Sequence, residues 1–157
     1  MAQKEKEAVV VAENRKARFN YHILDRLEAG IALVGSEVKA LRFQGANLID
    51  AHADYRNGEF ILLNMDIPKY KGANRMNHEP RRNRTLLLHR REIKKLQGKM
   101  LMKGFSVVPL SVYFNARGIA KVELALVQGK KAHDKRETEK QRDWSREKGR
   151  VMRRESE

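Results

Sequence analysis

Few residues in this chain are spaced as a catalytic or metal site requires. The sequence holds five histidines, and no two lie four positions apart, the spacing that would present a histidine pair to a metal ion on a helix. His52 lies between Asp50 and Asp54, but alternating polar side chains at a strand edge account for that pattern without a metal. The absence of cysteine excludes thiol nucleophiles, disulfides and thiolate zinc sites. We therefore expect no enzymatic reaction, no metal site and no other cofactor.

One short segment carries the letters that end a phosphate-binding loop. Gly129 and Lys130 match the last glycine and the lysine of that loop, but Leu124 occupies the position of its first glycine. Lys131 stands where a hydroxyl residue would bind magnesium. We therefore interpret Lys130 and Lys131 as cations of a basic segment and not as parts of a nucleotide-binding loop.

Positive charge is the strongest chemical signal in the sequence. The net charge is +14, and two segments carry all of the excess. Residues 69–103 contain twelve Lys or Arg and two acids, whereas residues 130–157 contain eleven Lys or Arg and seven acids. Such charge attracts polyanions. Nucleic acid is favoured over an anionic membrane, because these segments lack the amphipathic apolar face that membrane binding requires.

The first basic segment begins with a predicted loop over residues 70–84, where glycine, asparagine and proline recur without apolar periodicity. Its arginines have almost no acids beside them in the sequence, which favours phosphate contact; they are Arg75, Arg81, Arg82 and Arg84. The helix expected next has a basic face, for which RNA contact and simple solvation remain equal alternatives; it consists of Arg91, Lys94, Lys95 and Lys99.

The elements that must position these charges are mostly short strands. Residues 19–23 alternate apolar and polar side chains, as a half-buried strand does. Ser36 can cap a short helix that runs through Arg42. Asn57 and Gly58 can adopt the positive φ angles of a tight hairpin.

A helix and a second hairpin complete the expected domain over residues 8–129. Residues 90–103 place Ile93, Leu96, Met100 and Leu101 on one stripe, and residues 105–114 and 119–127 form paired strands. Pro109 requires an edge or bulge position in its strand. This pattern predicts a mainly β (α+β) fold, an OB-type antiparallel β-barrel with a few short helices. An α+β sandwich fits nearly as well.

Both chain ends differ from this domain in composition. Residues 1–7 alternate charges and predict a flexible N-terminus. Residues 130–157 contain three large apolar side chains, too few to offset the entropy of ordering; they are Trp144, Val151 and Met152. Acid and base residues three apart nevertheless favour a helix there. We expect a basic C-terminal tail that is disordered when free and becomes helical on contact with a partner. No signal-peptide core or membrane-length apolar run occurs, so we expect a cytoplasmic protein.

Several strings together resemble the SsrA-binding protein family, also called small protein B. The two most specific are EVKALR at residues 37–42 and GKKAHDKR at residues 129–136. Other matching stretches occur in family order and extend over nearly the whole chain, at residues 14–18, 27–31, 86–93, 108–110 and 113–114. The tail departs from the family pattern at Gly149, where a charged residue or alanine is usual, at a cost of about 1 kcal/mol of helix stability.

The resemblance implies an OB-type barrel that binds the tRNA-like domain of transfer-messenger RNA. Such a protein enters a stalled ribosome with that RNA, elongation factor Tu and GTP, and contacts the elongation factor only through the RNA. Its tail then lies near 16S rRNA at the decoding centre and occupies the empty message channel, so that rescue and peptide tagging begin.

The site residues follow partly from this resemblance and partly from charge. The predicted RNA-binding residues are Asn14, Arg15, Lys16, Arg18, Glu28, Leu87, Lys121, Lys130 and Lys131. The predicted ribosome-binding residues of the tail are His133, Asp134, Lys135, Arg136, Trp144, Val151 and Met152. Glu28 has two open roles, either to accept from a base amine or a 2′-hydroxyl, or to orient a neighbouring arginine.

Two other classes of protein share this composition. A permanent ribosomal component would have a basic head and an rRNA-embedded tail, but embedded tails usually contain few acids. An RNA-processing enzyme on an OB scaffold would need a metal or an acid–base site, which the sequence lacks.

Overall fold

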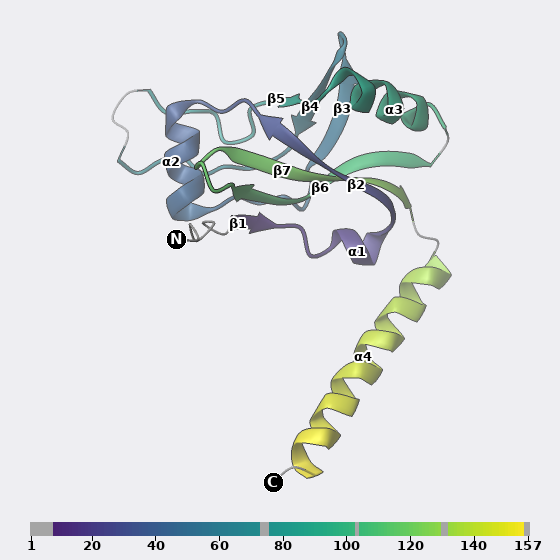
Figure 1. The fold of residues 1–157 in the computed structure, drawn as a ribbon. Coiled ribbons are helices and arrows are strands. Elements are labelled where there is room, and N and C mark those ends of the chain that lie inside the picture. Colours follow the sequence, from purple (N-terminus) through teal and green to yellow (C-terminus); the bar gives the residue numbers. More distant parts are fainter. Residues whose placement is uncertain (1–7, 73–75, 103, 130–131, 156–157) are drawn as a thin grey trace, which may run out of the picture.

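Seven strands form one antiparallel sheet that closes on itself in the computed structural model, which describes residues 8–72, 76–102, 104–129 and 132–155 (Figure 1). The strand order is β1-β6-β3-β4-β5-β2-β7, and pairing of β6 with β7 closes the ring. The prediction of an OB-type barrel is therefore confirmed. The strands are β1 (Val9–Glu13), β2 (Tyr21–Ile31), β3 (His52–Arg56), β4 (Glu59–Leu63), β5 (Arg84–Leu87), β6 (Phe105–Phe114) and β7 (Ala120–Gly129).

The hairpins form where the turn residues allow them. Asn57 and Gly58 join β3 to β4 with φ angles of 51° and 83°, as their types predict. The register of β6 against β7 shifts between Pro109 and Ser111, so the proline lies at a bulge, where it removes no regular ladder bond. Both predictions are confirmed.

The barrel interior is filled from the inward faces of the strands and from two helices. Helix α2 (Gly35–Gln44) buries Ala40 and Leu41, and α3 (Arg90–Met100) buries Leu96. The strands contribute the largest buried side chains of the core, among them Phe60, Leu62, Val107, Val112, Val122 and Leu124.

Three details differ from the sequence expectations. Helix α2 begins one residue before Ser36, and Glu37 accepts the Val34 backbone N–H at 3.0 Å, so a carboxylate and not a hydroxyl satisfies the helix start. Leu101 lies beyond the last residue of α3 and is 84% exposed, so it leaves the predicted apolar stripe. Phe19 belongs to α1 (Ala17–Asn20), and the strand begins only at Tyr21.

A buried ion pair joins α2 to β5 through Glu37 and Arg84, and both side chains are fully buried. The Arg84 guanidinium also donates to the carbonyl oxygens of Met65 at 2.7 Å and Pro80 at 3.0 Å. Arg82 reaches the same carboxylate from the protein surface. These contacts fix the start of β5 and the end of the preceding loop against α2.

A small second cluster of buried residues places α1 on the outside of the barrel. Ala17 packs with Val108, Ala125 and Val127, which face outward from β6 and β7. Covering this apolar patch holds α1 close to the strands, and the polar and charged residues around Ala17 remain exposed.

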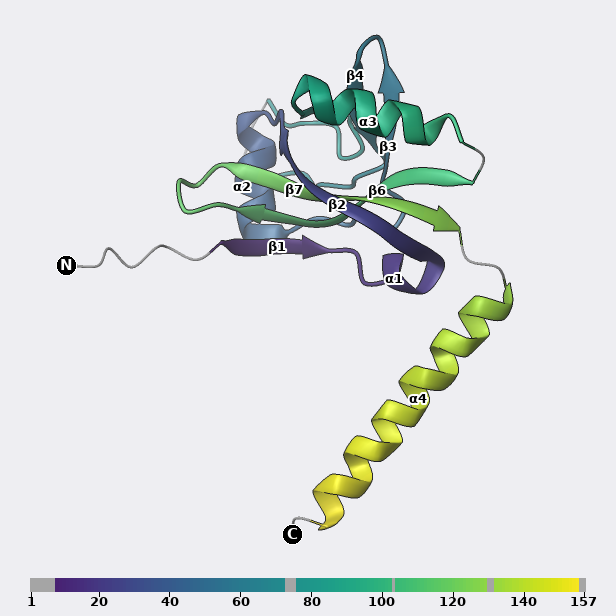
Figure 2. The ribbon, with the colours of Figure 1, turned by 45° about the vertical axis from the view of Figure 1, so that its right-hand side comes forward.

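Helix α4 (Ala132–Glu155) projects away from the barrel beside α1 (Figures 1 and 2). It runs through Gly149 without a break. One contact with the barrel places the Arg142 guanidinium 5.8 Å from the centre of the Phe19 ring. Most of the α4 surface is exposed, and the ordering of this tail on contact with a partner stays a prediction.

Candidate RNA-binding surface

Three neighbouring strands present polar side chains on one outer face of the barrel. Alternation along each strand sends Val112, Val122 and Leu124 inward and the residues between them outward. The outward residues lie next to one another because β7 pairs with both β2 and β6. We call this face, together with Leu87 of the adjoining β5, the strand surface, and it consists of Arg26, Glu28, Leu87, Ser111, Tyr113, Lys121 and Glu123.

Glu28 is the centre of a small polar network on the strand surface. The Tyr113 hydroxyl donates to one Glu28 oxygen, and the Lys121 ammonium lies 3.9 Å from the other. Burial, together with the hydrogen bond to Glu28 and nearby negative charge, raises the pKa of the Tyr113 hydroxyl well above its ordinary value of 10.0. Tyr113 therefore stays protonated and remains a donor. The cation beside Glu28 is Lys121 and not an arginine. This contact does not support the role of orienting a neighbouring arginine, so acceptance from a base amine or a 2′-hydroxyl is the role that we carry forward.

Leu87 adds an exposed apolar side chain to the edge of this network. It ends β5 and is 60% exposed. Gly30 pairs with Leu87 on one side and with Lys121 on the other, so β5, β2 and β7 meet there. A Cβ atom on Gly30 would lie 3.1 Å from that of Leu87, so glycine permits this close approach. An apolar contact beside a carboxylate and an ammonium group suits the ribose and base edges of RNA.

Asn14 is buried and holds the segment between β1 and α1 in place. Its amide donates to the carbonyl oxygens of Leu48 at 3.2 Å and Pro109 at 3.1 Å. Its Oδ1 atom has no hydrogen-bond partner among the described residues. The side chain thus positions the exposed cations that follow it.

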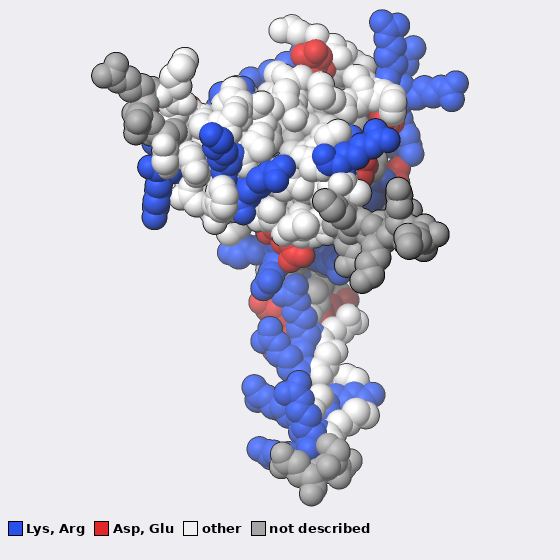
Figure 3. All heavy atoms as spheres, turned by 60° about the vertical axis from the view of Figure 1, so that its left-hand side comes forward, with Lys and Arg blue, Asp and Glu red and all other residues white. Residues whose placement is uncertain are grey.

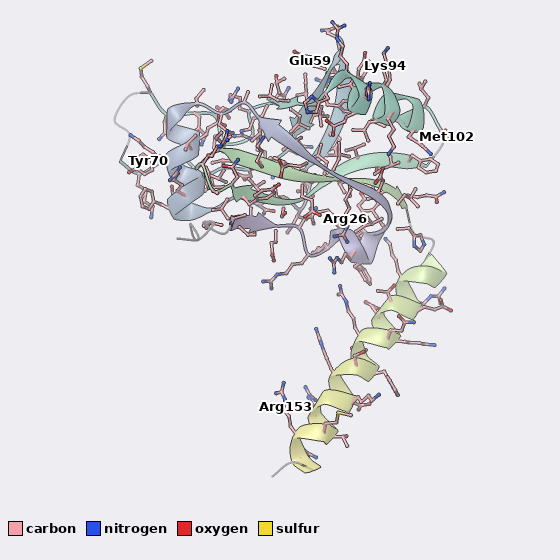
Figure 4. All side chains as sticks on the ribbon, viewed as in Figure 1. Arg26, Glu59, Tyr70, Lys94, Met102 and Arg153 are labelled. Atoms are coloured by element: carbon pink, nitrogen blue, oxygen red, sulfur yellow. The ribbon has the colours of Figure 1, made fainter. Side chains whose placement is uncertain are left out.

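The cations that follow Asn14 border a cleft on the barrel surface. Arg15, Lys16 and Arg18 are exposed around the buried Ala17. The cleft has a volume of about 520 Å³ and is lined from β1, α1, β2, β6, β7 and α4, with arginines at positions 15, 18, 26 and 142. Figure 4 shows Arg26 on β2 near α1. Two acids partly balance this charge, because Glu13 lies 3.6 Å from Arg15 and Glu123 lies 3.5 Å from Arg26.

The structure corrects the expectation of phosphate contact for Arg84 of the 70–84 loop and gives Arg81 and Arg82 acidic partners. Arg84 is fully buried against Glu37, and Arg82 bonds to the same carboxylate. Arg81 lies 4.0 Å from Asp50 and 3.8 Å from Asp66, although more than half of its side chain is exposed. The acids that pair with these arginines come from distant parts of the chain. Arg75 lies outside the described residues.

The basic face of α3 is separate from the α1 cations. Arg91, Lys94 and Lys99 are exposed, and Lys95 donates to Asp25 at 2.6 Å. That hydrogen bond is the main reason why the pKa of the Asp25 carboxyl lies below its ordinary value. Figure 4 shows Lys94 on the far side of the barrel from α4.

The tail residues predicted to bind the ribosome lie on α4. Lys135 and Arg136 lie in its first turns, and Trp144 is 65% exposed with the Lys148 ammonium 5.1 Å from the centre of its ring. Val151 and Met152 are also exposed. The side chains of His133 and Asp134 and all of Lys130 and Lys131 lie outside what the structure describes.

Four members of the strand surface were not predicted as site residues, namely Arg26, Ser111, Tyr113 and Glu123. The alternation of β2, β6 and β7 marks each of them as outward-facing. The sequence does not give the register that brings Tyr113 opposite Lys121 or Glu28 opposite Glu123.

The described residues contain neither a candidate metal site nor a helix that could span a membrane. Within the described ranges, no three histidine, aspartate or glutamate side chains gather as a metal ion would need. The helices described are too polar or too short to cross a lipid bilayer.

Comparisons with known proteins agree over nearly the whole chain. A family model described as SmpB protein matches residues 11–154. A protein of Rhodopseudomonas palustris named SsrA-binding protein is 58% identical over 154 residues, 98% of each chain. One of the same name from Bradyrhizobium diazoefficiens is 57% identical over the same share.

A solved structure has a fold similar to that of this chain. Its description reads "tmRNA-SmpB: a journey to the center of the bacterial ribosome". That chain is 49% identical, aligns with a TM-score of 0.66, and the match covers 78% of this chain and 85% of that one. With the family model spanning both the barrel and the tail, the chain belongs to the SmpB protein family.

Proposed function

We propose that this chain binds the tRNA-like domain of transfer-messenger RNA and delivers it to stalled ribosomes, acting in trans-translation without catalysing a reaction. The observation that carries this proposal is the strand surface, in which Glu28, Tyr113 and Lys121 form a fixed polar network beside the exposed Leu87. Family membership supports the choice of RNA, since relatives at 57–58% identity carry the name SsrA-binding protein.

Affinity and recognition have different sources on this surface. Arg15, Lys16 and Arg18 supply positive charge that attracts phosphates of any sequence. The Glu28 carboxylate accepts a hydrogen bond from a 2′-hydroxyl or a base amine. Attraction to phosphates alone does not distinguish RNAs that differ in these groups. The cations and the carboxylate lie on the same side of the barrel, so one folded RNA domain can contact both. Lys130 and Lys131 extend the predicted RNA contacts toward the tail.

The tail supplies the second half of the function. We propose that α4 enters the empty message channel near 16S rRNA, with residues 133–136 at the decoding centre and Trp144, Val151 and Met152 farther along. The exposure of all three apolar side chains supports this role, because they have no core to join in the described structure. Elongation factor Tu with GTP would be a partner through the RNA alone. The proposed location is the cytoplasm, and no membrane contact is proposed.

Co-purification tests the choice of RNA. Tagged full-length protein is recovered from a bacterial lysate, and the bound RNA is sequenced. The proposal expects transfer-messenger RNA to dominate. Ribosomal RNA in equal proportion with ribosomal proteins would instead support a permanent ribosomal component and overturn the proposal.

A charge-neutral variant tests the position of the RNA surface. Lys16→Gln removes one exposed cation beside α1, so it should lower the slope of log affinity against log salt by about 1. Lys94→Gln makes the same change on α3 and should leave the slope unaltered. Binding of the tRNA-like RNA is measured by fluorescence anisotropy at several salt concentrations. Equal losses in both variants would mean that binding follows net charge alone and would contradict the proposed surface.

A further inference from the structure

Two aromatic rings stack on the surface at the end of the barrel away from α4. Phe43, near the end of α2, is 76% exposed. Its ring centre lies 6.3 Å from that of Tyr70, with 25° between the ring planes. Figure 4 shows Tyr70 beside α2, at the opposite end of the barrel from Met102. An exposed phenyl ring of this kind is costly in water and adds nothing to the barrel core.

The Tyr70 ring is held in position by its own loop. The Tyr70 backbone N–H donates to the Asn77 side chain at 3.1 Å, and that side chain donates back to the Tyr70 carbonyl at 3.0 Å. A Cβ atom on Gly72 would lie 2.8 Å from the Tyr70 ring, so any side chain there would displace the ring. Tyr70 is therefore a preorganised support that leaves the other face of Phe43 open.

The surroundings of this pair carry positive charge. The Lys39 ammonium lies 5.9 Å from the centre of the Tyr70 ring. Residues 38–49 and 67–72 contain four Lys or Arg, and the acids that flank them, Glu37, Asp50 and Asp66, each lie beside an arginine of residues 81–84. One of these four, Arg42, covers Phe114 and donates to the Gly118 carbonyl, which leaves Lys39, Lys69 and Lys71 exposed. Figure 3 turns this side forward and shows basic side chains standing around a mostly uncharged surface.

We propose that Phe43, Tyr70 and Lys39 form a second RNA-binding surface, which stacks an unpaired nucleobase on Phe43 and holds the adjoining phosphates with lysines. Stacking on exposed aromatic rings flanked by cations is how proteins bind single-stranded RNA with little sequence preference. An acidic peptide would also meet the lysines, but it would leave the flat ring face without a stacking partner. The surface lies apart from the strand surface and α1, so the chain can contact two RNA segments at once.

A tryptophan placed at position 43 provides a local reporter for this proposal. Full-length protein carrying Trp144→Phe and Phe43→Trp has its single tryptophan on the aromatic pair. Hexaadenylate should quench its fluorescence in a saturable way, because the bases stack on the indole. In the same chain, Tyr70→Leu should weaken this binding at least about fivefold, whereas Tyr70→Phe should retain it. Lys39→Gln should lower the salt slope by about 1.

Two probes of matched length separate the alternatives. An abasic hexanucleotide has the phosphates without the bases and should not quench the tryptophan. Hexaglutamate has the negative charge of an acidic peptide and should not quench it either. Equal quenching by either probe, or no response to hexaadenylate, would overturn the second surface. Circular dichroism of each variant shows that the barrel is intact, and anisotropy with the tRNA-like RNA reports the proposed function separately.

Discussion

Glu37 binds two arginines of the basic loop and holds one of them, Arg84, in the core. It lies 47 positions before Arg84 and 45 before Arg82, yet it binds both side chains. Few acids lie near these arginines in the sequence, so they were expected to be free for phosphate. Their acidic partner is too distant along the chain to be predicted from local sequence. For the same reason Tyr113 was not predicted as a site residue, because its contact with Glu28 joins residues 85 positions apart. Exposed cations whose neighbours are local, such as Lys16, could be predicted from sequence.

Replacing Glu37 should change how stability depends on pH. Burial alone would raise the pKa of this carboxyl, but hydrogen bonds from Arg82, Val34 and Arg84 lower it below its ordinary 4.5. Its contribution to stability is therefore complete above pH 4.5 and is lost as the pH falls through the lower folded-state value. Glu37→Gln should cost about 3–5 kcal/mol at pH 7, because it leaves Arg84 charged and unpaired in the core.

Urea unfolding at a series of pH values measures this effect. The gap between wild type and Glu37→Gln should narrow below pH 4.5 as the native carboxyl takes up its proton. Asp54→Asn provides a control, because that carboxylate forms an exposed pair with Arg56 and should change stability little. A gap that stays constant down to the acid transition would contradict the role assigned to Glu37.

Turns and helices were predicted more successfully than their boundaries. Asn57 and Gly58, the bulge at Pro109 and the inward stripe of α3 all follow from local chemistry, and all are present. The end of α3 differs because Leu101 meets no partner in the core, a fact that depends on neighbouring strands. The closed ring also needed tertiary information, since the pairing of β3 with β6 joins strands that are far apart in the sequence.

Gly149 should limit the stability of the last turns of α4. Nothing lies within 4 Å of the Cβ position at this residue, so alanine fits there without strain. Gly149→Ala should raise the helix-to-coil equilibrium constant of the surrounding residues about fivefold, from about 1 kcal/mol of helix propensity. Cα chemical shifts of the full-length protein report the change. Gly98→Ala, an equally open position in α3, should leave the shifts of α4 unaltered, and an unchanged α4 in Gly149→Ala would contradict the prediction.

The whole molecule divides into a barrel that carries the proposed RNA contacts and a helix that extends from it. The strand surface is formed by β2, β5, β6 and β7, Phe43 belongs to α2 with Tyr70 beside that helix (Figure 4), and α4 leads away from the barrel (Figures 1 and 2). In the proposed function, this arrangement lets one chain contact three sites. Composition predicted this division, because the share of apolar residues falls sharply after Gly129.

Truncation after Gly129 should separate binding from rescue. The barrel retains the strand surface and the α1 cations and loses only Lys130 and Lys131 of the predicted RNA-binding residues, so affinity for the tRNA-like RNA should remain nearly intact. Tagging of stalled products in a reconstituted translation system should be lost, because no helix remains to enter the ribosome. A large loss of RNA affinity would place essential contacts in the tail and would contradict this division.

The 24 residues of α4 determine both how far its side chains lie from the barrel and in which direction they point. A helix of this length spans about 36 Å, and each residue turns it by about 100°. Trp144 and Val151 lie seven positions apart and therefore point in nearly the same direction. Two residues inserted after Lys140 would rotate both by about 200° relative to the barrel, whereas seven would advance them about 10 Å with almost the same orientation. The seven-residue insertion would therefore change the distance of Trp144 and Val151 from the barrel, and the two-residue insertion would change their direction. Comparing peptide tagging by the two variants would show whether the ribosome requires the distance or the direction.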